Sequence, residues 1–596
     1  MATLSAVPAT RIPGGSFLIE ERKPEDVFTP EDFTEQHLLI AQTAEEFANK
    51  EIVPNIEKME HKDFSVTREL LKKAGELGLS GVDVPEQYGG MELDKVTSAI
   101  IADRIAKYGG FSTTWGAHTC IGTLPIVYFG TEEQKKKYLP GLASGEKVGA
   151  YALSESSSGS DALNCRTRAV LSADGKHYLL NGEKMWITNA GFADLFIIFA
   201  KVDDKFTAFI VERGFAGFSV GAEEHKMGIR GSSTCPLILN DCKVPVENVL
   251  GEIGKGHHIA FNVLNVGRLK LGAGCVGSAR NCIESAIAYA KQRKAFGKVI
   301  ADFGLIREKL ANMAAGIFTG EAMAYRTVGM MDTAIAQLDP GHTDMAPVRK
   351  VIDEYAVECS ILKVWGSEFI SYVVDEAVQI YGGYGFVEEY PAERNYRDVR
   401  VNRIFEGTNE INRLVITAFL LKRAMSGQLP LKAAIKKLMD EVLSGTSTEG
   451  EEGSLAQEHK MVAAAKKIGL FAAGIATQKY MQAIQDQQEA MGAIANMVIE
   501  TYAMESAVLR AQKLAARNGE AGAALAVAMT RVYISGAMEK IESAARMVVA
   551  ACAEGDMLRS QLAILRRLCK YEPFNTLALR RTIAQRVIET SKYMVA

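Results

Sequence analysis

The stretch "RIFEGTNEINR", residues 403–413, places a glutamate in an unusual setting. Glu406 directly follows the bulky pair Ile404–Phe405 and directly precedes Gly407. From Thr408 onward, apolar residues recur at helical spacing, which predicts a helix that begins there. Glu406 would then stand just outside a helix N-terminus among apolar neighbours, where burial raises a carboxyl pKa. The alternative is an ordinary carboxylate that the helix dipole favours, and spacing alone leaves both open.

The composition around this stretch is that of a large globular protein. The chain has 596 residues, 48% of them hydrophobic, and a net charge of −4, so several packed units are expected. No basic excess indicates a nucleic-acid partner. The nine cysteines are scattered without metal-ligand spacing, so we expect reduced thiols and no metal. The N-terminus resembles no secretion signal and no apolar run is long enough for a membrane span. Bacterial-type cytoplasm is expected.

Hydrophobic periodicity predicts an α+β fold of segregated blocks. Helices are expected before residue 150, one ending at Pro54 and another capped by Thr131 and stopped at Pro140–Gly141. Short β-rich runs follow, with Asn181–Gly182 as a hairpin turn between two strands. Long helical segments then return. The expected units are an N-terminal segment (1–29), an N-terminal helical domain (30–150), a central antiparallel β-domain (151–255), a four-helix bundle carrying the catalytic base (256–427) and an additional C-terminal helical bundle (428–596).

The C-terminal region opens with two distinct segments. Residues 431–444 begin with "LKAAIKKLMDEVL", which predicts an amphipathic helix. Residues 444–454, "SGTSTEGEEGS", have the composition of a flexible linker. The amphipathic helix has two interpretations. It makes a weak peripheral contact with an anionic membrane, or its apolar side packs on the bundle or on another subunit.

Two motifs suggest contacts with a flat, phosphorylated ligand. The loop "YALSESSSGSDA" (151–162) gathers hydroxyls on a flexible backbone that can wrap a phosphate, although composition alone favours a plain solvated loop. In "GEKMWITNAG" (182–191), Trp186 and Thr188 lie two apart and share a face in a strand. An aromatic plane beside a hydroxyl suits a heterocycle such as flavin, whereas a buried core tryptophan is the alternative.

Two further motifs lie in helical surroundings. In "KQRKAFGK" (291–298), Arg293 and Phe296 are spaced i, i+3 near an expected helix end. The arginine suits a pyrophosphate or a helix C-terminus. "QIYGGYGF" (379–386) lets backbone approach a ligand closely.

These motifs occur in one order together with "VPEQYGG", "FGTEEQKKKYLPGLASGE", "FGLIREKLA" and "RIFEGTNEINRL". In this combination, residues 30–425 resemble the acyl-CoA dehydrogenase family. The helical extension makes the chain most similar to the very-long-chain branch, which also carries a second C-terminal bundle. The resemblance implies FAD between the β-domain and the bundle, acyl-CoA as substrate, trans-2-enoyl-CoA as product in fatty acid β-oxidation, an electron-transfer flavoprotein as acceptor, and a homodimer.

The resemblance also implies site residues. Glu406 matches the catalytic base, which takes the α-proton of the thioester while a hydride leaves the β-carbon for the flavin. Some relatives place the base at the position of Gly267, which cannot ionise here. Flavin contacts are implied for Leu153, Ser154, Gly159, Ser160, Trp186, Thr188, Thr408 and Glu410, and contacts to the FAD of a neighbouring subunit for Arg293, Phe296, Gln379 and Gly383. Substrate contacts are implied for Ser160, Arg268, Gly407, Gly116 and Ala117.

Small residues at the pocket floor, Gly116 and Ala117, would leave room for a long acyl chain, since each buried methylene adds about 0.8 kcal/mol. Two other functions remain on the same fold. An acyl-CoA oxidase would pass electrons to oxygen, and a non-catalytic assembly protein would keep the fold without turnover.

Overall fold

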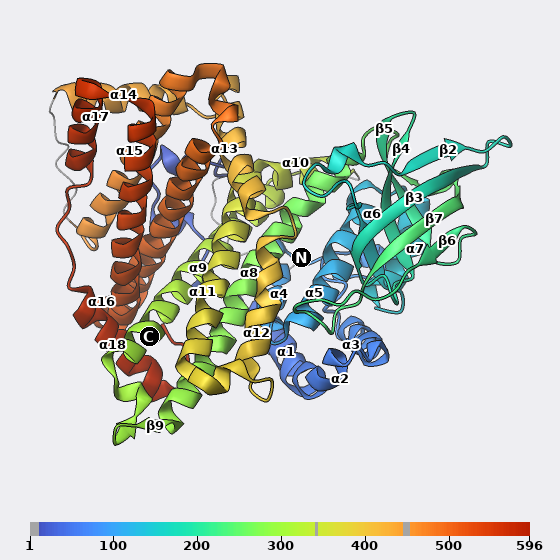
Figure 1. The fold of residues 1–596 in the computed structure, drawn as a ribbon, viewed down its shortest axis with the longest axis horizontal. Helices are drawn as coiled ribbons and strands as arrows, with labels where there is room; N and C mark the ends of the chain where they lie inside the picture. The colour runs from blue at the N-terminus through green and yellow to red at the C-terminus, as the bar shows by residue number, and fades with distance from the viewer. Residues whose placement is uncertain (1–10, 340–343, 445–452, 596) are drawn as a thin grey trace.

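The computed structural model describes residues 11–339, 344–444 and 453–595. The mixed α+β fold predicted from the sequence is confirmed, and it is mostly helical. Figure 1 shows a β-sheet region at one end, a long helix bundle in the middle and the C-terminal helices on the far side of the bundle. The N-terminal helices lie beside the sheet and beneath it.

The N-terminal helices form as the sequence predicts, with two local corrections. Thr131 accepts a hydrogen bond from the Gln134 amide and caps the last of them. That helix does not stop at Pro140 but continues through it to Ala143, since only its last turn lies beyond the proline. Pro54 likewise lies in a 3₁₀ turn inside a nearly continuous helical path. The helices are α1 (Glu35–Phe47), α2 (Ile56–Glu60), α3 (Phe64–Glu76), α4 (Lys95–Arg104), α5 (Gly109–Gly116), α6 (Leu124–Phe129) and α7 (Glu132–Ala143).

The sheet is largely antiparallel, in the order β6-β7-β3-β2-β4-β5-β8, and β1 pairs with β4 in parallel. Alternate residues of β4 point into two different cores, so both faces of the sheet are covered. The strands are β1 (Gly149–Ala152), β2 (Arg168–Leu171), β3 (His177–Thr188), β4 (Leu195–Val202), β5 (Lys205–Glu212), β6 (Phe218–Val220), β7 (Thr234–Pro245) and β8 (Val249–Leu250).

The hairpin predicted at Asn181–Gly182 is wrong. Strand β3 runs straight through this pair, and its register against β7 shifts between Leu180 and Gly182. The glycine has φ +150, and a Cβ there would lie 2.5 Å from Thr167 Oγ1. The pair therefore forms a β-bulge, in which glycine admits a close neighbouring strand.

The bundle is built on three long helices. Helix α8 ends at Gln292, and Arg293 directly follows its end. The predicted helical i, i+3 spacing of Arg293 and Phe296 is therefore wrong, because Phe296 lies outside the helix. Instead, Phe296 and Gly297 both have positive φ and form the turn of a small hairpin. The elements are α8 (Gly256–Gln292), β9 (Lys294–Ala295), β10 (Lys298–Val299), α9 (Gly304–Ala336), α10 (Ala346–Glu354), α11 (Ala356–Tyr381), α12 (Pro391–Val399) and α13 (Asn409–Ser426).

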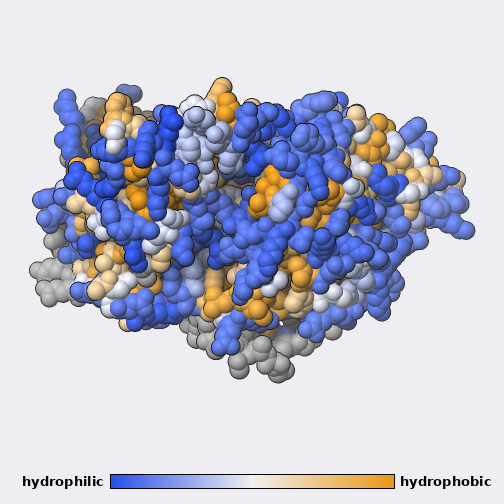
Figure 2. Space-filling model, turned by 90° about the horizontal axis from the view of Figure 1, so that it is seen from below, coloured by the Kyte–Doolittle hydropathy of each residue, from blue (hydrophilic) through white to orange (hydrophobic). Residues whose placement is uncertain are grey.

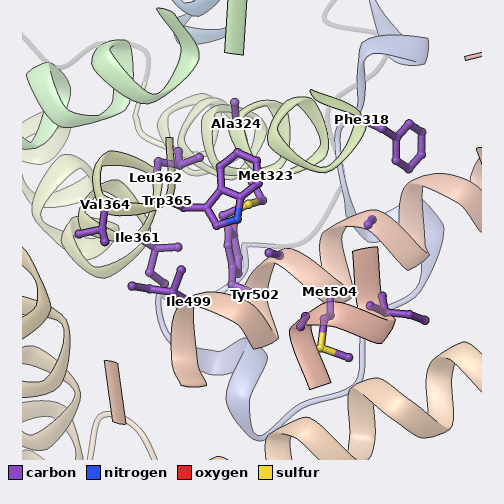
Figure 3. Close-up of a cluster of buried hydrophobic side chains, with 14 of the residues drawn as sticks. Phe318, Met323, Ala324, Ile361, Leu362, Val364, Trp365, Ile499, Tyr502 and Met504 are labelled. Atoms are coloured by element: carbon purple, nitrogen blue, oxygen red, sulfur yellow. The ribbon is translucent and has the colours of Figure 1, made fainter. Parts of the chain in front are cut away.

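The C-terminal region is helical, as predicted, and shares one core with the bundle. Figure 3 shows side chains of α9, α11 and α16 meeting in this core, among them Met323, Trp365 and Tyr502. The linker predicted at 444–454 falls mainly on 445–452, which lie outside the described residues. The helices are α14 (Leu431–Ser444), α15 (Ala456–Tyr480), α16 (Gln488–Cys552), α17 (Gly555–Leu568) and α18 (Thr576–Thr590).

Residues 11–33 form a strap between the bundle and α16. The Gly15 amide donates to Glu358 of α11 at 2.6 Å, and the Phe17 ring packs edge-on against Tyr502 of α16. Arg510 of α16 pairs with Glu31 at 2.8 Å. The strap therefore joins two regions that are distant in sequence.

Two C-terminal helices, α14 and α16, are candidates for contact with a membrane. The apolar side of α14 packs on α15, with Leu438 buried and Ile435 facing Gly474. Helix α16 is broken at Gly519, whose φ is +73, and it contains a stretch that is long and apolar enough to cross a membrane; half of that stretch is buried inside the protein. Its packing against α9 and α15 accounts for that composition.

Candidate active site

Glu406 lies in a sharp turn just before α13. Its φ is +59 and that of Gly407 is +81, so two consecutive residues are left-handed. Thr408 then caps α13 by accepting a hydrogen bond from the Ile411 amide. A glutamate seldom adopts this backbone, because its Cβ is strained there. Such strain is concentrated at functional sites.

Glu406 is half-buried, and one of its carboxylate oxygens is shielded from solvent. Its Oε2 atom is buried and has no hydrogen-bond partner among the described residues. Burial raises the pKa of Glu406 to about 7, and the charges of Arg268 and Lys363 oppose this rise. A desolvated carboxyl is therefore present, as predicted, although Ile404, which was expected to shield it, is itself 53% exposed.

Helix α8 leaves room for this carboxylate. A Cβ on Gly267 would lie 2.7 Å from Glu406 Oε2 and 2.9 Å from its Cδ. Position 267 is thus both unable to ionise and shaped to admit the side chain of Glu406.

Three side chains hold the backbone of the turn. Arg268 Nε donates to the Glu406 carbonyl at 3.1 Å, and Asn412 Nδ2 donates to the Gly407 carbonyl at 2.8 Å. Lys363 Nζ donates to the same Gly407 carbonyl at 2.6 Å. The sequence reading missed Lys363 and Asn412. Asn412 lies within the quoted stretch and could have been considered, whereas nothing around Lys363 in the sequence indicates its role.

Strand β1 connects this turn to the β-region. Tyr151 of β1 is buried, and this burial is the main cause that raises the pKa of its phenol. The negative charge of the nearby Glu406 carboxylate raises that pKa further. Three residues further on, the Ser154 carbonyl accepts a hydrogen bond from the Met185 amide. This contact places the Ser-rich loop directly beside Trp186.

Trp186 is not a core tryptophan. It is 57% exposed and has φ +58, at a register irregularity near the end of β3. Ile187 is buried and Thr188 is half-buried, so Trp186 and Thr188 still face the same side. A bare indole on a strained backbone offers a flat apolar surface to a ligand.

An ion pair within the β-region anchors the loop that follows β1. Glu155 is buried and pairs with Lys184 at 2.7 Å, a contact that the sequence reading did not anticipate. Leu153 and Ser154 are half-buried, whereas Gly159 and Ser160 are exposed. The ion pair fixes the base of the loop and leaves its tip free to meet a ligand.

The residues expected to contact the FAD of a neighbouring subunit lie in another part of the bundle. Arg293 stacks over the Tyr384 ring at 5.5 Å, and Phe296 is 94% exposed on the hairpin turn. Gln379 is also exposed, and a hollow of about 470 Å³ is lined by Arg293 and Gly383. Figure 1 places this hairpin at the lower end of the bundle, away from the sheet. Figure 2 views that end from below and shows hydrophobic groups among hydrophilic ones.

The remaining predicted residues differ in how they are placed. Gly116 ends α5, and a Cβ there would meet nothing within 4 Å, whereas Ala117 is buried. The Thr408 hydroxyl is occupied as a helix cap and Glu410 is exposed. Arg268 is buried and bound to the Glu406 turn.

Comparison with known proteins agrees with this geometry. Family profiles described as the acyl-CoA dehydrogenase N-terminal, middle and C-terminal domains match residues 34–146, 150–242 and 254–421. A further profile with the description "Acyl-CoA dehydrogenase, C-terminal domain" matches residues 464–567. The chain belongs to the acyl-CoA dehydrogenase family.

Individual relatives extend the likeness to the C-terminal region. A probable acyl-CoA dehydrogenase of Bacillus subtilis (strain 168) is 51% identical over 584 residues, 98% of each chain. A crystal structure of an acyl-CoA dehydrogenase complexed with FAD from Bacillus anthracis is 52% identical, has a TM-score of 0.97, and covers 98% of this chain and 100% of that one. The human mitochondrial very long-chain specific acyl-CoA dehydrogenase is 45% identical over 352 residues, 57% of this chain and 51% of that protein.

The enzyme is an FAD-dependent oxidoreductase of this family, and its residues fit the cofactor. The exposed indole of Trp186 and the side chain of Thr188 would hold the flavin ring, and the Ser154 loop lies beside them. When bound, FAD supplies the oxidant, a ring that takes up a hydride.

Proposed function

We propose that the enzyme converts long-chain saturated acyl-CoA to trans-2-enoyl-CoA, with Glu406 as the base that takes the α-proton. The observation that carries the proposal is the half-buried Glu406, whose Oε2 atom is buried and unpartnered and whose pKa burial raises to about 7. A base of ordinary acidity would hold a proton too weakly to take one from carbon, so the raised pKa increases the driving force.

The backbone of the same turn supports the reaction. The Glu406 amide donates to no acceptor among the described residues, while the carbonyls of Glu406 and Gly407 accept hydrogen bonds from Arg268 and Lys363. An unoccupied amide beside the base is suited to bind the thioester oxygen, whose negative charge grows as the proton leaves.

The preference for long chains rests on Gly116. The open space at its Cβ position leaves room for an extended acyl tail. We propose the strongest response at about C12 to C18, because each methylene buried adds about 0.8 kcal/mol. The likeness to the human very long-chain specific enzyme supports the same preference.

The proposed physiological setting follows the family. An electron-transfer flavoprotein would accept the electrons in fatty acid β-oxidation, and a homodimer would bring the Arg293 hairpin to a second flavin. All nine cysteines are free and eight are buried, which supports a reducing compartment, and we propose bacterial-type cytoplasm.

Anaerobic flavin bleaching tests the function. The holoenzyme is titrated with saturated acyl-CoAs of increasing length, and Glu406→Gln is the comparison. We expect bleaching by long chains and its loss in Glu406→Gln with the flavin spectrum retained. Steady peroxide production in air would instead indicate an oxidase. Absence of bleaching at any length would indicate a non-catalytic assembly protein.

A weak membrane contact through residues 431–444 is the remaining proposal. Since the apolar side of α14 lies on α15, such a contact would use the exposed lysines Lys432, Lys436 and Lys437. The test is sedimentation with anionic liposomes, compared between the full chain and a triple Lys→Glu variant. Equal sedimentation of both proteins would leave α14 as a packing helix alone.

A further inference from the structure

Lys363 of α11 is a buried lysine tied to the turn of the base. Its Nζ donates to the Gly407 carbonyl and to Asn409 Oδ1, each at 2.6 Å. These two acceptors lie on either side of Thr408, which caps α13. The ammonium therefore links the left-handed turn to the first residue of the following helix.

Lys363 acts together with two other donors. Arg268 and Asn412 both donate to the Glu406 carbonyl, at 3.1 and 3.3 Å. With Lys363 on the next carbonyl, helices α8, α11 and α13 each contribute one donor to this turn. A strained backbone persists only where its surroundings determine it in this way.

A buried ammonium is costly unless it is compensated. Lys363 has no exposed surface, and within the described residues no carboxylate oxygen lies within 4 Å of its Nζ. Neutral oxygens of the turn and of Asn409 receive its hydrogen bonds instead. Such an arrangement has little value for stability, which points to a role at the adjacent base.

We propose that Lys363 is a positioning residue, which holds the Glu406 turn by its hydrogen bonds and places a positive charge beside that turn. The inference rests on the proposed role of Glu406 as the base. It adds a residue that acts on that base without touching the substrate.

The groups around Glu406 support the electrostatic half of the proposal. Arg268 and Lys363 are the cations whose charges lower the pKa of Glu406 against its burial. Burial raises the pKa of Cys120 to about 12, and it raises that of Tyr151 well above its usual value, so both remain neutral. Three other groups act on the pKa of Lys363: the charge of Arg268 lowers it, and Cys275 and Glu410 raise it.

Lys363 is itself charged at neutral pH. Burial lowers its pKa to about 8, and the attraction of Glu406 opposes that fall. Its positive charge is therefore present at the pH where Glu406 titrates.

Three substitutions separate the two roles. Lys363→Gln keeps a donor and removes the charge, Lys363→Met removes both, and Lys363→Arg keeps both. We measure kcat, KM and the pH dependence of kcat/KM with palmitoyl-CoA, together with flavin content and thermal melting. Lys363→Gln is the milder of the two uncharged variants, and it carries the test if Lys363→Met does not accumulate with flavin.

The expected result is an upward shift of the acid limb by about one pH unit in Lys363→Gln and Lys363→Met. Lys363→Met should also lose kcat by about tenfold or more with KM nearly unchanged, because the turn loosens. Lys363→Arg should leave the limb in place.

Lys466→Met is the matched control. Lys466 of α15 is a half-buried lysine that also donates to a carbonyl, that of Glu20 at 2.7 Å, and it pairs with Glu505. Its loss should lower the melting temperature without moving the acid limb. An unshifted limb in both uncharged Lys363 variants would overturn the inference, while full turnover in Glu406→Gln would instead overturn the proposed function.

Discussion

Gly267 and Glu406 are matched across two segments of the bundle, because the carboxylate occupies the space in which a side chain at position 267 would begin. A Cβ there would lie 2.7 Å from Oε2 and 3.1 Å from Oε1. Since both oxygens crowd the same point, the whole carboxylate would have to move to admit even one methyl group.

The substitution Gly267→Ala should therefore misplace the base. We expect kcat to fall by about ten- to a hundredfold, since small displacements of a reacting group have effects of that size. Steady-state turnover and flavin absorbance measure the effect. Gly274→Ala on the same helix is the control, because its Cβ would meet only the Ala102 carbonyl at 3.6 Å. Equal activity of both variants would show that the carboxylate relocates freely.

The pH dependence of kcat/KM should report the base in the free enzyme. Burial raises the pKa of Glu406 to about 7, and only its ionised form can take a proton. We expect kcat/KM to rise with pH through about 7 and to level off above it. An acid limb near the ordinary glutamate value would contradict the buried state of this carboxylate.

The stability of the fold should depend on the same carboxylate, but it should fall as pH rises, whereas kcat/KM rises. Because folding raises its pKa from 4.5 to about 7, the folded protein binds more protons between these values and loses stability as pH rises through them. Above pH 7 the loss approaches about 3 kcal/mol. Glu406→Gln should therefore melt higher than the parent enzyme at pH 8, and calorimetry should show this difference vanishing near pH 4.5. A lower melting point at pH 8 would refute the argument.

Trp186→Ala should weaken flavin binding without unfolding the sheet, because the indole is mostly exposed. We expect about a tenfold loss of affinity, which corresponds to one aromatic contact. Flavin retained after gel filtration measures it. Leu171→Ala, another exposed apolar residue of the sheet, serves as the control. Undiminished flavin in Trp186→Ala would remove this residue from the cofactor site.

Mixed dimers should show whether the Arg293 hairpin serves a partner. Glu406→Gln and Phe296→Asp chains are each expected to be inactive alone. Co-expressed, they should regain up to about half the activity per hybrid, since one site then combines an intact base with an intact hairpin from the other chain. Tagged purification of the hybrid and turnover measure this recovery. No recovery in a stable hybrid would assign the hairpin to its own subunit's surface.

The sequence predicted what depends on local pattern. Helical spacing after Thr408 placed Glu406 just before a helix, as the structure has it. The bulky Ile404 does not cover the carboxylate, because it is 53% exposed, and the carboxylate lies against Gly267 of α8 instead. Asn181–Gly182 misled because the same left-handed tolerance that makes a hairpin also makes a bulge, and only the neighbouring strand decides between them.

Other features depend on partners far along the chain. Arg293 leaves its helix because the following Phe296–Gly297 pair turns back as a hairpin. Lys363 meets the base only after α11 folds against α13, so no nearby signal could reveal it. The roles of the individual site residues and the exact domain boundaries stay predictions.

The strap of residues 11–33 means that the C-terminal helices are not an appendage that can be cut away to leave a smaller relative. Arg510 pairs with both Glu31 and Glu321 at 2.8 Å, and Tyr593 donates to the same Glu321 at 2.9 Å. Deleting the C-terminal helices would leave the carboxylates of Glu31 and Glu321 without these partners, and it would expose the apolar core that the bundle shares with α16. Residues 11–33 can therefore make these contacts only after the ribosome has synthesised the C-terminal helices.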